Sequence, residues 1–69
     1  MKYDRVEYYA GYKGEERPVA VYVGELRLEV VRLISVKRIQ EKGGSRFIEI
    51  FECLLANGET VKIERELEI

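Results

Sequence analysis

The stretch RFIEIFECLLANGETVKIERELEI, residues 46–69, carries the clearest fold signal in the chain. Near its centre is Asn57-Gly58, a dipeptide that supplies the positive φ angles of a type I′ β-hairpin. The arm after this turn alternates between apolar and polar residues, which predicts a strand with one buried and one wet face. Its apolar phase holds Val61, Ile63, Leu67 and Ile69, interrupted by Arg65, and its polar phase holds Lys62, Glu64, Glu66 and Glu68. We expect the three glutamates to form a solvated face rather than a cation site.

The arm before the Asn-Gly turn is apolar on both faces. One face holds Phe47, Phe51, Cys53 and Leu55, and the other holds Ile48, Ile50 and Leu54. A strand of this kind lies centrally in a closed barrel, contains a bulge, or meets a second subunit. The sequence leaves these three alternatives open. Cys53 has no cationic neighbour in this run, so we expect a buried and unreactive thiol.

Residues 25–42 are predicted to form one long, bent strand, with a helix as the alternative. The apolar residues alternate at first, and their phase then shifts twice, as in a bulged strand. Glutamates early in the segment, basic residues late in it and Gly43 after it are typical of a helix. On a helical wheel, however, the apolar residues scatter round most of the circumference, and β-branched residues are frequent. These two properties favour the strand.

Two more strands are expected upstream. Alternation predicts them over 5–12, with Tyr8 and Tyr12 facing the core, and over 19–23. The polar link 13–18 joins them, and Pro18 fits the first position of a strand, where its missing N–H does no harm. Further turns are expected at Gly24 and at 43–45.

Five consecutive antiparallel strands joined by short turns form a meander, and a small meander covers its edges by curling into a barrel. The predicted fold class is therefore all-β: a five-stranded antiparallel meander curled into a small SH3-like barrel. Neither a repeat nor a linker divides the sequence, so we expect one domain over residues 1–69.

The composition argues against most catalytic chemistry. The chain of 69 residues has no histidine and a single cysteine. Histidine is the commonest general base and metal ligand, and a zinc site needs more Cys and His residues than this chain has. Gly43-Gly44 lacks the flanking residues of a phosphate-binding loop. We therefore expect a protein that is not an enzyme, with no cofactor and no metal.

The sequence also predicts the cellular setting. A chain of this size in a secreted protein is usually held by disulfides, and one cysteine cannot form one within the chain. No apolar run has the length of a signal sequence or a membrane span. We expect a cytoplasmic protein without membrane contact. Small domains often gain stability from a partner, so a homodimer is a further expectation.

Two surfaces are candidates for contact with a protein partner. Tyrosines on a β surface anchor peptides or stack on bases, and the first candidate combines three of them with Arg5. The second is the additional apolar face of the fourth strand. The residues of this predicted partner surface are Tyr3, Tyr9, Tyr22, Ile48, Ile50 and Leu54. As the alternative, these tyrosines make ordinary cross-strand pairs.

A basic strip is the candidate surface for nucleic acid. It runs through the middle of the chain and comprises Arg32, Lys37, Arg38, Lys42 and Arg46. Such a strip suits a phosphate backbone. The formal net charge of the whole chain is nevertheless −1, whereas dedicated nucleic-acid binders are usually basic. A solvated charged face is the simpler interpretation.

The run Arg17-Pro18-Val19-Ala20-Val21-Tyr22, with Gly24 and Val30 after it, resembles the opening pattern of a family of short uncharacterised prokaryotic β-domain proteins. That family pairs an Arg-Pro strand with a later glycine-containing hairpin, here Asn57-Gly58-Glu59, and the resemblance covers residues 8–66. The chain departs from the pattern in having no tryptophan. The resemblance implies a small β domain and brings no activity, cofactor or functional residue.

The leading functional hypothesis is a non-enzymatic interaction module. It binds a protein partner or a copy of itself through the tyrosines or the doubly apolar fourth strand. The alternative is a small barrel that binds nucleic acid through the basic strip within residues 32–46. An enzyme using Glu, Tyr or Lys chemistry is the least favoured hypothesis.

Overall fold

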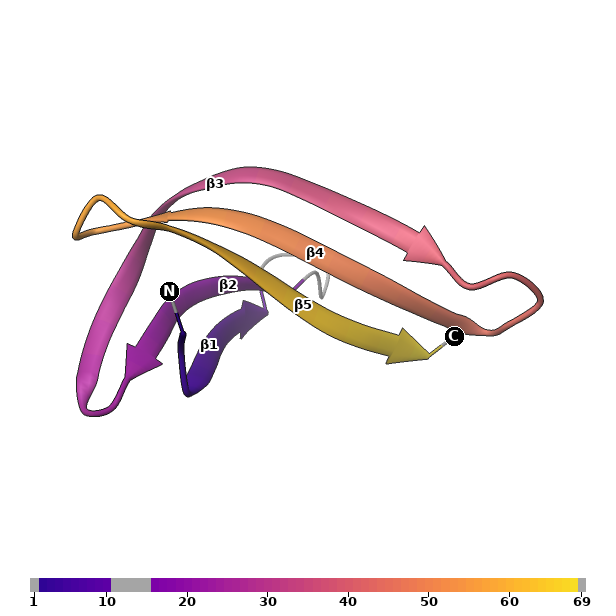
Figure 1. The fold of residues 1–69 in the computed structure, drawn as a ribbon, viewed down its shortest axis with the longest axis horizontal. Helices are drawn as coiled ribbons and strands as arrows, with labels where there is room; N and C mark the ends of the chain where they lie inside the picture. The colour runs from indigo at the N-terminus through magenta and orange to yellow at the C-terminus, as the bar shows by residue number, and fades with distance from the viewer. Residues whose placement is uncertain (1, 11–15, 69) are drawn as a thin grey trace.

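A computed structural model describes residues 2–10 and 16–68 of the chain (Figure 1). They form five antiparallel strands in the sheet order β1-β2-β3-β4-β5. The strands are β1 (Arg5–Ala10), β2 (Glu16–Val23), β3 (Leu26–Gln40), β4 (Arg46–Leu55) and β5 (Thr60–Glu68). The predicted all-β meander is confirmed. The positions of Tyr12 and of the link 13–15 lie outside the described residues.

Most of the segment 25–42 forms the strand β3, so the prediction of a long strand is confirmed and the helix alternative is wrong. β3 runs through 15 residues and belongs to two ladders. Its first part, from Leu26 to Glu29, pairs with β2, and its second part, from Val30 to Gln40, pairs with β4. Register shifts at two places in the second part explain the shifting apolar phase, because each inserts one extra residue into β3.

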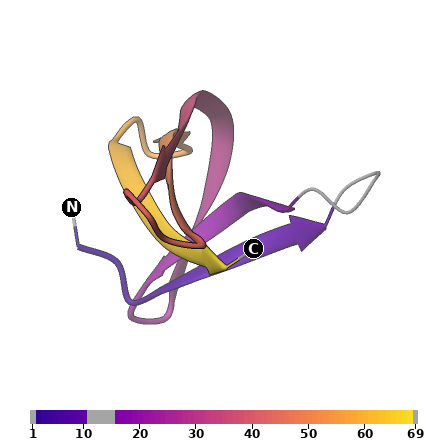
Figure 2. The same ribbon diagram turned by 90° about the vertical axis from the view of Figure 1, so that its right-hand side faces the viewer.

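The sheet curls into a half-barrel, as seen along its length in Figure 2. Among the described residues no ladder joins β1 to β5, so the barrel is open on that side. Side chains on the inner face make the core, which contains Val21, Leu28, Phe51, Cys53, Leu55, Val61 and Ile63. Tyr8 is partly buried against this core, and the prediction that Cys53 is buried is confirmed.

The β4–β5 hairpin is present, but its predicted two-residue turn is wrong. Leu55 donates its N–H to the Glu59 carbonyl at 2.8 Å, and Gly58 donates to the Leu55 carbonyl at 2.9 Å. The pair of Leu55 and Glu59 therefore closes a loop of three residues, with Gly58 in the left-handed region at φ 87°. Asn57 accepts a hydrogen bond from the Glu59 N–H on its side-chain oxygen, at 3.1 Å. This local bond explains why asparagine suits the loop.

Replacing Gly58 with alanine is expected to lower the free energy of unfolding by about 1–2 kcal/mol, because a Cβ disfavours the left-handed region. Gly44→Ala is the matched control: its φ is not in that region, and an added Cβ would meet the Glu41 Cβ at an ordinary 3.6 Å. We expect the control to be neutral or stabilising by up to about 1 kcal/mol. Urea denaturation measures both, and equal losses would contradict the loop geometry.

The predicted start of β2 at Pro18 is also wrong. The strand begins at Glu16, and Pro18 is buried inside it, opposite Tyr8. Two features of the ladders make the proline tolerable there. It adjoins the register shift between Glu7 and Tyr8, and this part of β2 pairs with β1 alone. Proline is accepted at a bulge or a sheet edge because no ladder hydrogen bond is lost.

Candidate functional site

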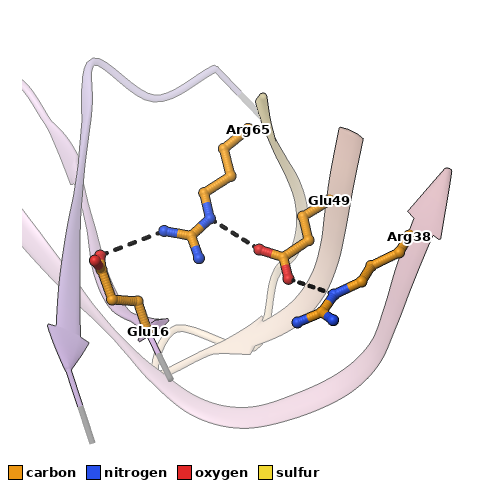
Figure 3. Close-up of polar contacts among 4 residues, drawn as sticks. All are labelled: Glu16, Arg38, Glu49 and Arg65. Atoms are coloured by element: carbon orange, nitrogen blue, oxygen red, sulfur yellow. Dashed lines mark hydrogen bonds and ion pairs between the residues drawn. The ribbon is translucent and has the colours of Figure 1, made fainter. Parts of the chain in front are cut away.

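Among the described residues the inner face contains one buried charge, the carboxylate of Glu49, whose side chain is 3% exposed. Glu49 lies directly opposite Arg65 in the β4–β5 ladder. Arg65 donates from Nε to Glu49 Oε1, and Arg38 donates from Nε to Glu49 Oε2, both at 2.9 Å. Arg65 also reaches Glu16 Oε2 on β2, at 3.3 Å. Figure 3 shows these four side chains converging across the half-barrel.

The Arg65 guanidinium also covers two aromatic rings. Its central carbon lies 4.9 Å from the Tyr8 ring centroid and 5.6 Å from that of Phe51. The charged cluster of Glu16, Arg38, Glu49 and Arg65 therefore connects β1 and β2 to the face of β4 and β5. In the described part of the chain, every buried side-chain nitrogen and oxygen has a hydrogen-bond partner. The buried atoms of the cluster are therefore satisfied within it, which suits a structural role.

The protonation of Glu49 supports this structural role. Burial raises the pKa of its carboxyl, but the hydrogen bonds from Arg65 and Arg38 outweigh burial and leave that pKa below the ordinary value. A general acid or base for neutral pH needs a pKa shifted the other way, towards 7. Glu49 therefore stays ionised and holds its two arginines.

The lowered pKa predicts acid sensitivity. A carboxyl with a depressed pKa in the folded state stabilises the protein fully above its unfolded pKa, near 4.5, and loses this contribution as the pH falls through the folded value. We expect the free energy of unfolding of the wild type to fall more steeply below about pH 4.5 than that of Glu49→Gln. Denaturant titrations from pH 7 to pH 2 measure both slopes. Parallel slopes would contradict the pKa assignment.

The three candidate tyrosines lie in different settings. Tyr3 is partly buried against the core, and Tyr9 is exposed. Tyr22 donates its hydroxyl to Glu7 at 2.8 Å, and the Arg5 guanidinium lies 4.2 Å from its ring centroid. Tyr22 thus makes cross-strand contacts between β1 and β2, and the predicted neighbourhood of Tyr22 and Arg5 is present.

The predicted basic strip is interrupted by acidic partners. Arg38 binds Glu49, and Arg46 binds Glu66 at 3.0 Å. Arg32, Lys37 and Lys42 are exposed, the last in the turn between β3 and β4. On the other side of β4, Glu64 and Glu66 are exposed on the outer face of β5. The five basic residues therefore do not lie on one uniformly positive surface.

The apolar residues Ile48, Ile50 and Leu54 lie together on the outer face of β4. All three are half-buried, between the rows of β3 and β5 that flank them. Their cross-strand neighbours include Ile39 and Lys37 on β3. The outer face of β4 therefore carries a narrow apolar row, interrupted by Glu52 and covered in part by neighbouring side chains.

A group of exposed apolar side chains lies on β3, which the sequence did not indicate as a partner surface. Between Val30 and Gln40 this strand pairs with β4 alone, so among the described residues its other side is an open edge. Most exposed large apolar side chains of the described residues lie here; we call them the edge patch: Val31, Leu33, Ile34, Val36 and Ile39. Val31 and Ile34 occupy the two register shifts and have no cross-strand partner.

One hydrogen bond fixes the direction of the backbone groups along this edge. Glu41 donates its N–H to the Arg46 carbonyl at 3.3 Å, so that N–H points towards β4. The direction alternates from residue to residue in a strand, and no register shift lies between Val36 and Glu41. The N–H groups of Val36, Arg38 and Gln40 therefore point to the open edge.

A comparison of the chain with protein-family models, curated proteins and solved structures found no match. The resemblance to an Arg-Pro β-domain family stays a prediction. Within residues 2–10 and 16–68, no group of His, Cys, Asp and Glu is placed to hold a metal ion. The same residues include no helix that is long and apolar enough to cross a membrane.

Proposed function

We propose that this protein is a non-enzymatic interaction module that binds an extended segment of a partner protein along the open edge of β3. The observation that carries this proposal is the combination of free backbone groups and exposed apolar side chains on one strand. An open edge is a template for another strand, and natural proteins usually keep such an edge short or polar. Here the edge is long and carries the edge patch.

Strand addition uses the two kinds of group that this edge offers. Main-chain hydrogen bonds to the N–H and C=O groups of Val36, Arg38 and Gln40 would provide affinity. Leu33 and Val36, which share the inner face, would contact alternate side chains of the added segment. The same observation supports a protein partner over nucleic acid, because phosphate binding makes no use of an apolar edge.

Site-specific photocrosslinking tests the proposal in the cells that naturally make the protein. A photoreactive phenylalanine derivative placed at Ile34 is expected to form a discrete adduct with one partner protein. The matched control carries the same group at Lys62, which is exposed on β5 and separated from β3 by β4. Adducts at neither position, or equal adducts at both, would contradict the assignment of the surface.

A second variant separates binding from folding. Val36→Pro removes one N–H that points to the open edge and no bond to β4, so proline is tolerated in the strand. We expect this variant, combined with the photoreactive group at Ile34, to keep the circular dichroism of the parent and to lose the adduct. An adduct that persists would show that the partner does not bind by strand addition.

A further inference from the structure

We infer that the segment that adds to β3 alternates apolar with acidic residues, its apolar side chains facing the half-barrel interior and its acidic ones facing outward. This inference rests on the proposed function and specifies the chemistry of the partner. It follows from the charges on the two faces of β3 and from the ladder that fixes these faces.

The outer face of β3 carries two exposed basic residues, beside Ser35 and Ile39. Arg32 pairs with Leu54, and Lys37 pairs with Ile50, so both lie on the outer face with exposed side chains. Neither of them has an ion pair among the described residues of the structure. In the turn that follows β3, the exposed Lys42 comes directly after the exposed Glu41. An added strand meets these charges directly across the edge, where opposite charges attract and like charges repel.

The inner face of β3 is apolar over the same length. Leu33 and Val36 lie opposite Cys53 and Phe51, and both β3 side chains remain exposed. Arg38 follows on this face, but its charge is engaged by Glu49. Successive side chains of a strand point to opposite faces. A segment with apolar residues in one phase and acidic residues in the other therefore matches both faces of the edge at once.

A second copy of this edge is a poor match. Two antiparallel copies of β3 aligned about Lys37 would bring the basic side chains of the two copies together across the new ladder, and like charges there are destabilising. The basic residues that attract an acidic segment thus also oppose self-pairing, which is a common means of protecting an edge strand. The charge pattern selects a different chain as the occupant.

Two synthetic peptides test the inference directly. The first is Glu-Val-Glu-Ile-Glu-Val-Glu, and the second is Lys-Val-Lys-Ile-Lys-Val-Lys, with the same apolar residues and opposite charge. Titration of isotope-labelled protein at low salt, followed by amide nuclear magnetic resonance, reports both affinity and place. We expect the acidic peptide to bind at least about tenfold more tightly, with the largest shifts at Val36, Arg38 and Gln40, and added salt to weaken it.

Charge reversal on β3 provides the matched variant. In the double variant Arg32→Glu and Lys37→Glu, the acidic peptide is expected to lose about tenfold in affinity and the basic peptide to gain a similar factor. Lys62→Glu makes a similar change on β5 and is expected to leave both affinities unchanged. All three altered residues are exposed, so amide spectra that overlay away from the substitutions would verify the fold.

The outcomes separate this inference from the proposed function. If the lysine peptide binds the same edge amides as tightly as the acidic one, the acidic specificity is overturned while strand addition stands. If the edge amides become protected only through dimerisation at high protein concentration, a second copy is the occupant and the inference fails. If no peptide binds and the Ile34 crosslink is also absent, both proposals fail.

Discussion

Replacing Glu49 with alanine is expected to lower the free energy of unfolding by about 3–5 kcal/mol, the cost of leaving one member of a buried ion pair without its partner. The group that loses its closest partner is the Arg65 guanidinium, whose side chain is only 20% exposed, lies over the rings of Tyr8 and Phe51, and keeps only the longer contact to Glu16 at 3.3 Å. Glu49 is also the carboxylate that both neighbouring arginines share. Its removal therefore loosens the connection between the two halves of the half-barrel.

Two controls identify the source of this loss. Arg38→Ala removes the other partner of Glu49, but the Arg38 side chain is 67% exposed, so we expect a loss of about 1 kcal/mol or less. In the double variant Glu49→Leu and Arg65→Met no buried charge is left unpaired, and we expect it to recover most of the lost stability. Urea denaturation measures all of these variants. A Glu49→Ala loss below about 1 kcal/mol would show that the pair is solvated rather than buried.

Replacing Phe51 with alanine is expected to cost about 3–5 kcal/mol, since it deletes a buried aromatic ring. Phe51 is 2% exposed, and its ring centroid lies 6.5 Å from that of Tyr8 in an edge arrangement. A domain of this size has a total stability of only roughly 3–10 kcal/mol. The variant is therefore expected to be largely unfolded at 37 °C by circular dichroism.

Phe47→Ala is the matched control for this substitution. Phe47 lies on the same strand and the same face, four ladder pairs away, but it is only half-buried. We expect it to lose clearly less stability than Phe51→Ala. If the unfolded population of Phe51→Ala prevents measurement, Phe51→Leu should lose about 1–2 kcal/mol. Similar losses at both positions would contradict a core centred on the middle of β4.

The strands could be predicted from the sequence because alternation and turn residues act locally. The buried charge pair also left a signal. Glu49 is in phase with Phe47 and Phe51, and Arg65 is in phase with Val61 and Ile63, so two opposite charges occupied apolar phases on adjacent strands. The exact register between the strands was needed to place them opposite each other. That register depends on the three-residue loop. The Asn57-Gly58 dipeptide alone had predicted a type I′ turn of two residues.

The open edge could not be predicted in the same way. The doubly apolar pattern of β4 predicted a partner surface at Ile48 and Ile50, yet those side chains are partly covered by the flanking strands. Exposure of the edge patch depends on where β2 stops pairing with β3, and this is a property of the curled sheet. The shifting apolar phase within 25–42 indicated the bulges, but not that one side of the strand would lack a neighbour.

Amide hydrogen exchange of the free protein tests the open edge most directly. The N–H groups of Val36, Arg38 and Gln40 are expected to exchange much faster than those of Lys37 and Ile39, which point to β4. Equal, strong protection of both sets at low protein concentration would mean that the edge of β3 is already covered. The surface on which both functional proposals rest would then not exist.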